Sequence, residues 1–196
     1  MILGWGEQLE QDRSLPDPVR QKATGIRTQC EKLRSLIDDL NLTSKLEYGA
    51  QPLRKETFAI GPLFRELVAQ FYDSPLAENC EISLNQTDSS EHAQISVDRT
   101  LLGRLLENLL NNSVRHNSKP VKISVQTKIK EDFLCLTVTD NGKGYPPEVL
   151  AALNLQETPE NTPHILGLHV VEQIAVAHGG RSVFEQNHPS GARTYV

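Results

Sequence analysis

The stretch that decides the fold covers residues 133–144 and reads Phe133-Leu134-Cys135-Leu136-Thr137-Val138-Thr139-Asp140-Asn141-Gly142-Lys143-Gly144. Its first part alternates apolar and polar side chains, which predicts a strand over residues 133–139 with one buried face. The same period directs Asp140 toward the core, where a carboxylate needs a hydrogen-bond donor. Gly142 and Gly144 then permit a turn and the close approach of another molecule to the backbone. Two interpretations stay open: Asp140 caps an ordinary turn, or it accepts a hydrogen bond from a ligand.

The composition indicates a globular, acidic chain. Hydrophobic residues make up 38% and charged residues 23% of the 196 residues, and the formal net charge is −5. This balance predicts a packed core and offers no basic patch to nucleic acid or an anionic membrane. No apolar run approaches the roughly 18 residues that span a bilayer, so we expect a cytoplasmic chain whose full-length protein reaches a membrane only through segments outside it. The cysteines lack disulfide or zinc-site spacing and fit a reducing compartment: Cys30, Cys80 and Cys135.

Before residue 48 the dominant pattern is a heptad seam with alternating steps of four and three: Val19, Ala23, Ile26, Cys30, Leu33, Ile37, Leu40 and Ser44. It predicts a helix from about residue 18 to 47, with Asp17 as its N-cap and Pro18 in its first turn. A shorter helix is predicted over residues 2–13. Such a hairpin buries its seam poorly alone, so we expect a homodimer through residues 1–47, as a four-helix bundle. The alternative is that the long helix packs against its own domain.

A domain boundary is expected where the helical period ends, between Tyr48 and Glu56. It divides the chain into a helical hairpin (1–56) and a second domain (57–196). There, predicted helices cover 62–77, 98–116 (capped by Asp98) and 167–177, and predicted strands cover 81–85, 93–97, 121–128 and 133–139, with a solvated turn over 88–92 and two closing strands. This order predicts an α+β fold, a two-layer sandwich in which helices cover one face of a mixed sheet.

The predicted helix 98–116 carries a polar stripe. Asn108, Asn112 and Arg115 are spaced four and three apart, which places them on one side of the helix. Such a stripe is usually the solvated side. Asparagine is a poor helix former, however, and its neutral oxygen could complete a magnesium shell or hold phosphate-bound water.

Two later segments also suit a nucleotide. Leu166-Gly167-Leu168 opens a predicted helix, and free amides at a helix start bind phosphate. His178-Gly179-Gly180 ends that helix, and its glycines favour an ordinary helix stop. The proline-rich segment from Tyr145 to Ile165 is either a lid or a plain surface loop. With a nucleotide bound, Asp140 would accept from the exocyclic amine of adenine.

Taken together, four motifs resemble the asparagine and glycine boxes of sensor histidine kinases. They are residues 107–116, 140–144, 166–168 and 178–180. The resemblance covers residues 57–196 as the catalytic ATP-binding domain, and residues 1–56 are similar to the dimerisation and histidine-phosphotransfer hairpin. That family belongs to the wider superfamily of gyrase, MutL and heat-shock chaperone ATPases, whose fold is a mixed sheet covered on one face by helices.

The resemblance implies ATP and Mg²⁺ as ligands and assigns roles by position. Asn112 would coordinate magnesium and Asp140 would hold adenine. Asn108, Arg115 and His116 would line the phosphate side. The other candidate site residues shape or adjoin the glycine turn and the phosphate cradle: Gly142, Gly144, Tyr145, Leu166, Gly167 and Leu168.

The resemblance also implies transfer rather than hydrolysis. Hydrolytic members of the superfamily carry a general-base glutamate one helical turn before the metal-binding asparagine, and this chain has Asn108 there. The γ-phosphoryl group of ATP would then pass to a histidine and on to the receiver domain of a response regulator. Two alternatives stay open: a degenerate nucleotide-binding dimeric scaffold without kinase activity, and a true ATPase.

The chain departs from the family pattern in three ways. The second glycine box usually reads Gly-x-Gly-Leu-Gly-Leu, whereas residues 163–168 keep only its end. Tyr145 replaces a small aliphatic residue. None of the six histidines lies in the hairpin, and residues 2–7 are similar to the stretch just after the phosphoacceptor motif. We therefore expect the chain to begin beyond the acceptor histidine and not to autophosphorylate by itself.

Overall fold

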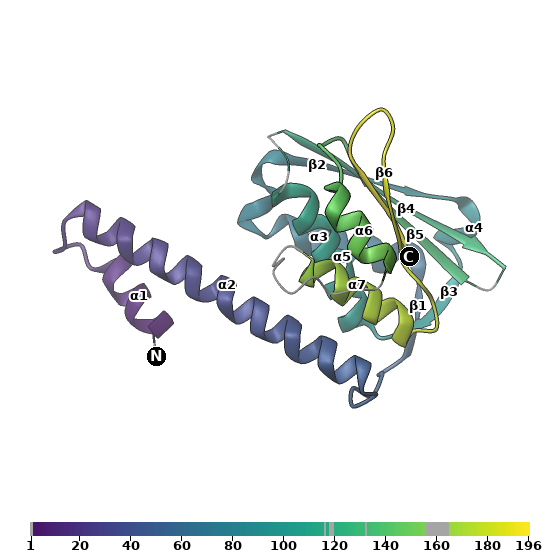
Figure 1. Ribbon diagram of the computed structural model, residues 1–196, viewed down its shortest axis with the longest axis horizontal. Helices are drawn as coiled ribbons and strands as arrows, with labels where there is room; N and C mark the ends of the chain where they lie inside the picture. The colour runs from purple at the N-terminus through teal and green to yellow at the C-terminus, as the bar shows by residue number, and fades with distance from the viewer. Residues whose placement is uncertain (1, 116, 118–119, 132, 156–164) are drawn as a thin grey trace. The chain divides into compact units, whose positions relative to one another are not determined.

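Figure 1 shows the computed structural model, which describes residues 2–115, 117, 120–131, 133–155 and 165–196. The chain divides into two compact units, Met1–Ser44 and Lys45–Val196. The division lies upstream of the expected domain boundary at 56/57, which stays a prediction.

The first unit contains the predicted helical hairpin, formed by α1 (Ile2–Gln11) and most of α2 (Asp17–Glu47). Asp17 is the first residue of α2 rather than a residue preceding it. The two helices approach closely at Gly6, where an added Cβ would lie 3.4 Å from the Cβ of Arg27. Arg27 Nε also donates to Glu10 Oε2 at 2.8 Å and so joins the helices. In the part of the chain that the structure describes, no helix is both long and apolar enough to cross a membrane.

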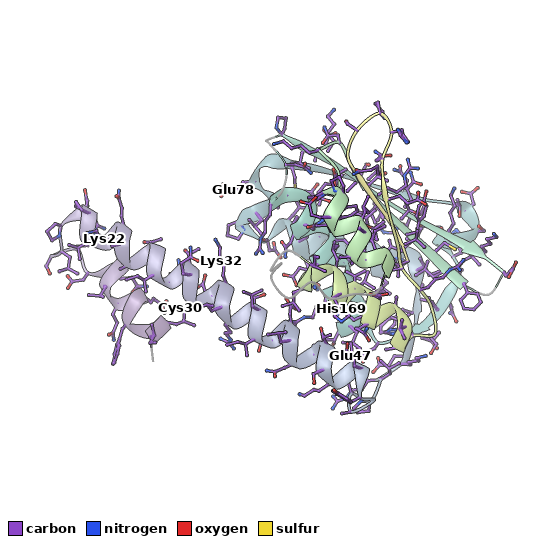
Figure 2. All side chains as sticks on the ribbon, viewed as in Figure 1. Lys22, Cys30, Lys32, Glu47, Glu78 and His169 are labelled. Carbon is purple, nitrogen blue, oxygen red and sulfur yellow. The ribbon has the colours of Figure 1, made fainter. Side chains whose placement is uncertain are left out.

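The heptad seam of α2 is largely uncovered in the single chain. Ala23 is buried, but Ile26, Leu33, Ile37 and Leu40 each keep 57–59% of their surface exposed. Figure 2 shows Cys30, another seam residue, along α2 with Lys22 and Lys32. A large apolar face of the hairpin therefore lacks a partner among the described residues.

The second unit is the predicted α+β sandwich. Its five-stranded sheet has the order β2-β4-β5-β7-β6, with β2 (Cys80–Gln86), β4 (Val121–Lys130), β5 (Phe133–Asp140), β6 (Val183–Gln186) and β7 (Ala192–Tyr195). The β2·β4 pair is parallel and the other pairs are antiparallel, so the sheet is mixed. One face carries α3 (Ile60–Tyr72), α5 (Arg99–Arg115), α6 (Pro147–Leu155) and α7 (Leu166–Ala177) (Figure 1).

The core lies between these layers. Alternate residues of β4 are fully buried, among them Val121 and Val125, and the leucines of α5 pack over them. Each such side chain stabilises the fold by about 1.5–3 kcal/mol through burial. As predicted, Asp98 caps α5, because its Oδ1 accepts from the Leu101 amide at 3.1 Å. Gly179 has φ +86° and ends α7, as its helix-stop pattern predicts.

Four local expectations were wrong. The segment 88–92 is not a solvated turn but contains the short helix α4 (Asp88–Glu91), whose fully buried Ser90 donates to the Thr127 carbonyl at 2.9 Å. The helix expected over 62–77 covers Ile60–Tyr72, and a 3₁₀ helix, η1 (Pro75–Asn79), follows it. A strand that periodicity did not indicate, β1 (Glu56–Ala59), pairs with β3 (Gln94–Val97).

The fourth correction is α6, a helix inside the segment 145–165, which contradicts the plain surface loop; the alternative of a lid stays a prediction. Pro147 is its first residue, a position that tolerates proline because the missing N–H would have no helical partner. Val149, Ala152 and Leu153 are buried and anchor the helix. The rest of the expected lid, residues 156–164, lies outside the described residues.

Candidate functional site

A cavity of about 280 Å³ opens between α5, α7 and the turn after β5. It brings together five of the candidate site residues predicted from the sequence, namely Asn112, Asp140, Gly144, Tyr145 and Leu168. The other lining residues are Asn117, Lys143, Pro146, Glu148, Val149 and Ala192. The cavity is therefore built from segments far apart in the chain.

Asp140 ends β5 and is only 5% exposed, as the strand period predicts. Its Oδ1 accepts three hydrogen bonds: from Asn117 Nδ2 at 3.1 Å, from the Gly142 amide at 2.8 Å and from the Ala192 amide at 3.1 Å. Its Oδ2 accepts from Ser113 Oγ at 3.1 Å. Among the described residues, Oδ2 thus accepts one hydrogen bond where Oδ1 accepts three, so Oδ2 is the oxygen with room for a further donor. The carboxylate is both fixed in place and available to a ligand.

The turn after Asp140 fits only with glycine at particular positions. Gly144 has φ +81°, and an added Cβ would lie 1.8 Å from Gln186 Oε1. Gly191, just before β7, has φ +109°, and its Cβ would lie 1.8 Å from the Asp140 carbonyl oxygen. The β6–β7 loop thus lies directly against the turn. Asn187 Nδ2 strengthens this contact by donating to the Asp140 carbonyl at 3.2 Å.

Gly142 contributes to the turn through its backbone. Its backbone amide donates a hydrogen bond to Asp140 Oδ1. Its lack of a side chain also allows Asn117 to approach, because an added Cβ would lie 1.5 Å from Asn117 Oδ1. Asn117 Oδ1 in turn accepts from the Lys143 amide at 2.9 Å. Gly142 shapes the wall around the carboxylate but does not line the cavity.

Tyr145 follows the turn and forms part of the cavity wall. Its hydroxyl lies 2.5 Å from Thr194 Oγ1, and its ring meets Phe184 edge-on at a centroid distance of 5.9 Å. Burial raises the pKa of Tyr145 to about 12. The phenol is therefore neutral at physiological pH.

The phosphate side, as predicted from the sequence, is more open. Asn108 Nδ2 donates to the Arg104 carbonyl at 3.0 Å, and its Oδ1 lies 3.0 Å from the position that a Cβ on Gly167 would take. Leu166 is half-buried at the start of α7, and Arg115 is exposed at the end of α5. None of these four residues lines the cavity. His116 lies outside the described residues.

Sequence reasoning missed the residues that hold the site together. Ser113 and Asn117 reach Asp140 from α5 and the segment after it. Gly191 reaches it from the β6–β7 loop, and Ala192 from the start of β7. Gly191 carried a signal, as a glycine just before a closing strand, but that signal indicates only a turn. The bonds of Ser113 and Asn117 depend on which elements meet in space.

Comparison with known proteins places the chain in a family. A family model described as "Histidine kinase-, DNA gyrase B-, and HSP90-like ATPase" matches residues 97–196, just over half of the chain. The chain is 30% identical over 189 residues to the sensor histidine kinase YvrG of Bacillus subtilis (strain 168); the match covers 91% of this chain but 32% of that protein. The chain thus spans about a third of the relative's length.

Solved structures agree on the fold. Full-length ShkA in complex with AMPPNP superposes with a TM-score of 0.75 at 24% identity, covering 99% of this chain and 41% of that one. ThkA in complex with the response regulator protein TrrA gives 0.72 at 21% identity, covering 99% and 55%. The chain belongs to the histidine kinase-, DNA gyrase B- and HSP90-like ATPase family, and its curated relatives include sensor histidine kinases.

Proposed function

We propose that this chain binds Mg²⁺-ATP in the cavity around Asp140 and serves as the catalytic region of a sensor histidine kinase. One observation carries the proposal: a buried carboxylate, fixed by four donors, keeps an acceptor site on Oδ2 beside a cavity. An exocyclic amine of adenine supplies the missing donor. A carbonyl oxygen at that position, as in guanine, would instead face a negative charge without a proton between them.

The cavity suits the base and ribose rather than the whole nucleotide. Its volume of about 280 Å³ lies near the lower end of small-molecule sites, which begin at about 300 Å³. Val149 and Leu168 offer apolar contacts to a base. The triphosphate would extend past Asn112 toward the start of α7, whose first amides have no helical partners.

The residues present also fit magnesium. Among the described residues, no cluster of three or more His, Cys, Asp or Glu side chains could hold a metal by itself. Mg²⁺ often binds through one or two protein oxygens plus water and substrate phosphates. Asn112 offers one such oxygen at the cavity wall, and the ion would neutralise charge on the phosphates.

Transfer to a protein acceptor is favoured over hydrolysis by Asn108. Its side chain is neutral and bonded to the Arg104 carbonyl, so it cannot remove a proton from water. In the complete protein, we propose, the γ-phosphoryl group goes to a histidine outside this chain and then to a receiver domain. That the fold relative ThkA was solved with a response regulator supports this choice of partner.

The exposed seam of α2 supports homodimerisation through residues 1–47. Four large apolar seam residues between Ile26 and Leu40 each expose more than half of their surface. A second copy offers the same seam, and a four-helix bundle would bury both.

The first test is Asn112→Asp with Asn111→Asp as its control. The carboxylate adds a negative charge next to the phosphates, so Mg²⁺-dependent ATP binding should fall at least about tenfold, while thermal unfolding stays unchanged. The same charge at Asn111 on the same turn should matter less, because Asn111 does not line the cavity. Calorimetric titration with Mg²⁺-ATP measures both, and undiminished binding by Asn112→Asp would contradict the assignment.

The second candidate is a dimeric scaffold that has lost nucleotide binding. The observation that favours it is Ile165, a buried branched residue that caps α7 without a side-chain hydrogen bond where the family usually has glycine-rich sequence. If the chain fails to bind ATP at millimolar concentration yet dimerises, this candidate replaces the first. Steady release of phosphate would instead indicate an ATPase.

A further inference from the structure

The first turn of α7 is joined by a side-chain contact to a residue 122 positions earlier in the chain. His169 directly follows the predicted phosphate cradle, Leu166-Gly167-Leu168, and its Nε2 lies 3.2 Å from Glu47 Oε1. Glu47 is the last residue of α2 (Figure 2). Both residues belong to the second unit, which begins at Lys45. The end of α2 therefore contacts the part of the site that is expected to meet the triphosphate.

The His169 ring lies between two carboxylates. A carboxylate only accepts hydrogen bonds, so the ring donates from Nε2 to Glu47. On its other side, Nδ1 lies 3.6 Å from Oε2 of Glu172, three residues further along α7, which is an electrostatic contact rather than a hydrogen bond. The side chains of His169 and Glu172 are only 19% and 20% exposed. Solvent therefore screens these contacts less than it screens an ion pair on the open surface.

The backbone of His169 links the ring to the phosphate end of the site. Its amide donates to the Ile165 carbonyl at 2.9 Å, which is the first hydrogen bond of α7, and Ile165 is buried. The amides of the three residues between them, 166–168, have no carbonyl of the same helix to bind. These are the amides that the proposed function assigns to phosphate. A displacement of His169 would therefore redirect them.

We propose that Glu47, His169 and Glu172 form a latch through which the end of α2 sets the position of the phosphate-binding amides, with His169 as the positioning residue. This inference rests on the proposed function of the site. Since α2 runs from the first unit into the second, a change at its end would alter the affinity for the phosphates and leave the base contact at Asp140 untouched. Because such coupling is reciprocal, a bound triphosphate would in turn stabilise the latch.

Glu47→Ala breaks the latch, and Glu78→Ala, at an exposed side chain, makes the same charge change as a matched control. Binding of ATP and of adenosine to the whole chain is measured by calorimetry in excess Mg²⁺. We expect Glu47→Ala to lower the affinity for ATP about fivefold, the lower end of coupling between linked sites, and to leave the affinity for adenosine unchanged. Glu78→Ala should alter neither affinity.

Substitutions of His169 test whether the two residues act as one unit. His169→Ala should cause the same loss as Glu47→Ala, and the double variant no greater loss, because both changes remove one interaction. His169→Gln, whose amide nitrogen can donate in place of Nε2, should retain most of the affinity. A merely structural role would lower the affinities for ATP and adenosine together. Equal losses for the two ligands overturn the proposal, as does an unchanged ATP affinity in Glu47→Ala or losses that add in the double variant.

A second readout needs no nucleotide. In the free chain, hydrogen exchange of the His169 amide should be about fivefold faster in Glu47→Ala, because the first turn of α7 opens more often without the latch, and unchanged in Glu78→Ala. If exchange is faster while the wild type binds no ATP, the latch stands and only the proposed function fails. If exchange is unchanged, the latch fails.

Discussion

The two glycine-bearing ends of the candidate site are built differently. At the base end, Asp140 and the following turn are fixed by hydrogen bonds from α5, from the segment after it and from the β6–β7 loop. At the phosphate end, α7 begins without a side-chain cap among the described residues, and Gly167 has Asn108 as its near neighbour. The base end is therefore organised before a ligand arrives, whereas the phosphate end leaves its amides for the ligand to satisfy.

This difference indicates which end of the site tolerates substitutions. At the base end, the neighbour of Gly191 is a backbone atom, the Asp140 carbonyl oxygen, which cannot move without disturbing strands β5 and β7. The neighbour at the phosphate end is the tip of a side chain, which can rotate. We expect substitutions at the base end to cost stability and binding together, and those at the phosphate end to affect mainly binding.

Gly191→Ala should have the largest effect, because it breaks the base end. Its Cβ would lie 1.8 Å from the Asp140 carbonyl oxygen at φ +109°, which combines backbone strain with a clash that only backbone movement relieves. We expect about 3 kcal/mol of lost unfolding free energy and no measurable ATP binding. Urea denaturation measures the first and calorimetry the second.

Gly179→Ala is the matched control, since Gly179 also has positive φ, +86°, but has no atom within 4 Å of an added Cβ. Its unfolding free energy should fall only by the cost of placing alanine at a positive φ, about 1 kcal/mol. If the two variants lose equal stability, the close contact between the β6–β7 loop and the turn contributes nothing.

Asp140→Asn should have the next largest effect and acts on binding. The carboxamide oxygen can keep the three donors on Oδ1, but the second oxygen, the one with spare acceptor capacity, becomes an amide. Losing a charge-assisted hydrogen bond costs about 1.5–3 kcal/mol, so ATP affinity should fall roughly tenfold to a hundredfold. Asp88→Asn, at an exposed side chain, makes the same charge change and should leave the affinity unaltered; a smaller loss at Asp140 than at Asp88 would remove Asp140 from the site.

Much of this architecture could be predicted from local patterns. The period of β5 predicted a buried Asp140, and the heptad seam predicted α2, because both patterns reflect which face of one element is covered. α6 was missed because Pro147 indicates a loop unless it is recognised as a first-turn residue. β1 was missed because the strand exists through its pairing with β3 rather than through a pattern of its own.

The hydrogen bonds that hold Asp140 in place could not be predicted in the same way. Asn117 and Ala192 act on one oxygen of Asp140 from 23 and 52 positions away in the chain. In the sequence, Asn117 is simply a polar residue after a helix and Ala192 the first residue of a strand, so neither position indicates a contact with Asp140. Only the mixed sheet order, which places β7 beside β5, brings the Ala192 amide to the carboxylate.

Gly167→Ala should have the smallest effect on stability and sharpens the contrast with Gly191. Its Cβ would lie 3.0 Å from Asn108 Oδ1, a side-chain atom that can move, and alanine favours a helix over glycine by up to about 1 kcal/mol. The two contributions roughly cancel, so the unfolding free energy should change by less than about 0.5 kcal/mol.

ATP affinity should still fall a few fold, roughly 1 kcal/mol, because the methyl group hinders the approach of phosphate to the first amides of α7. Adenosine, which lacks phosphates, should bind both forms equally. Equal losses for ATP and adenosine would place the effect at the base, and a stability loss as large as that of Gly191→Ala would show that the phosphate end is as rigid as the base end.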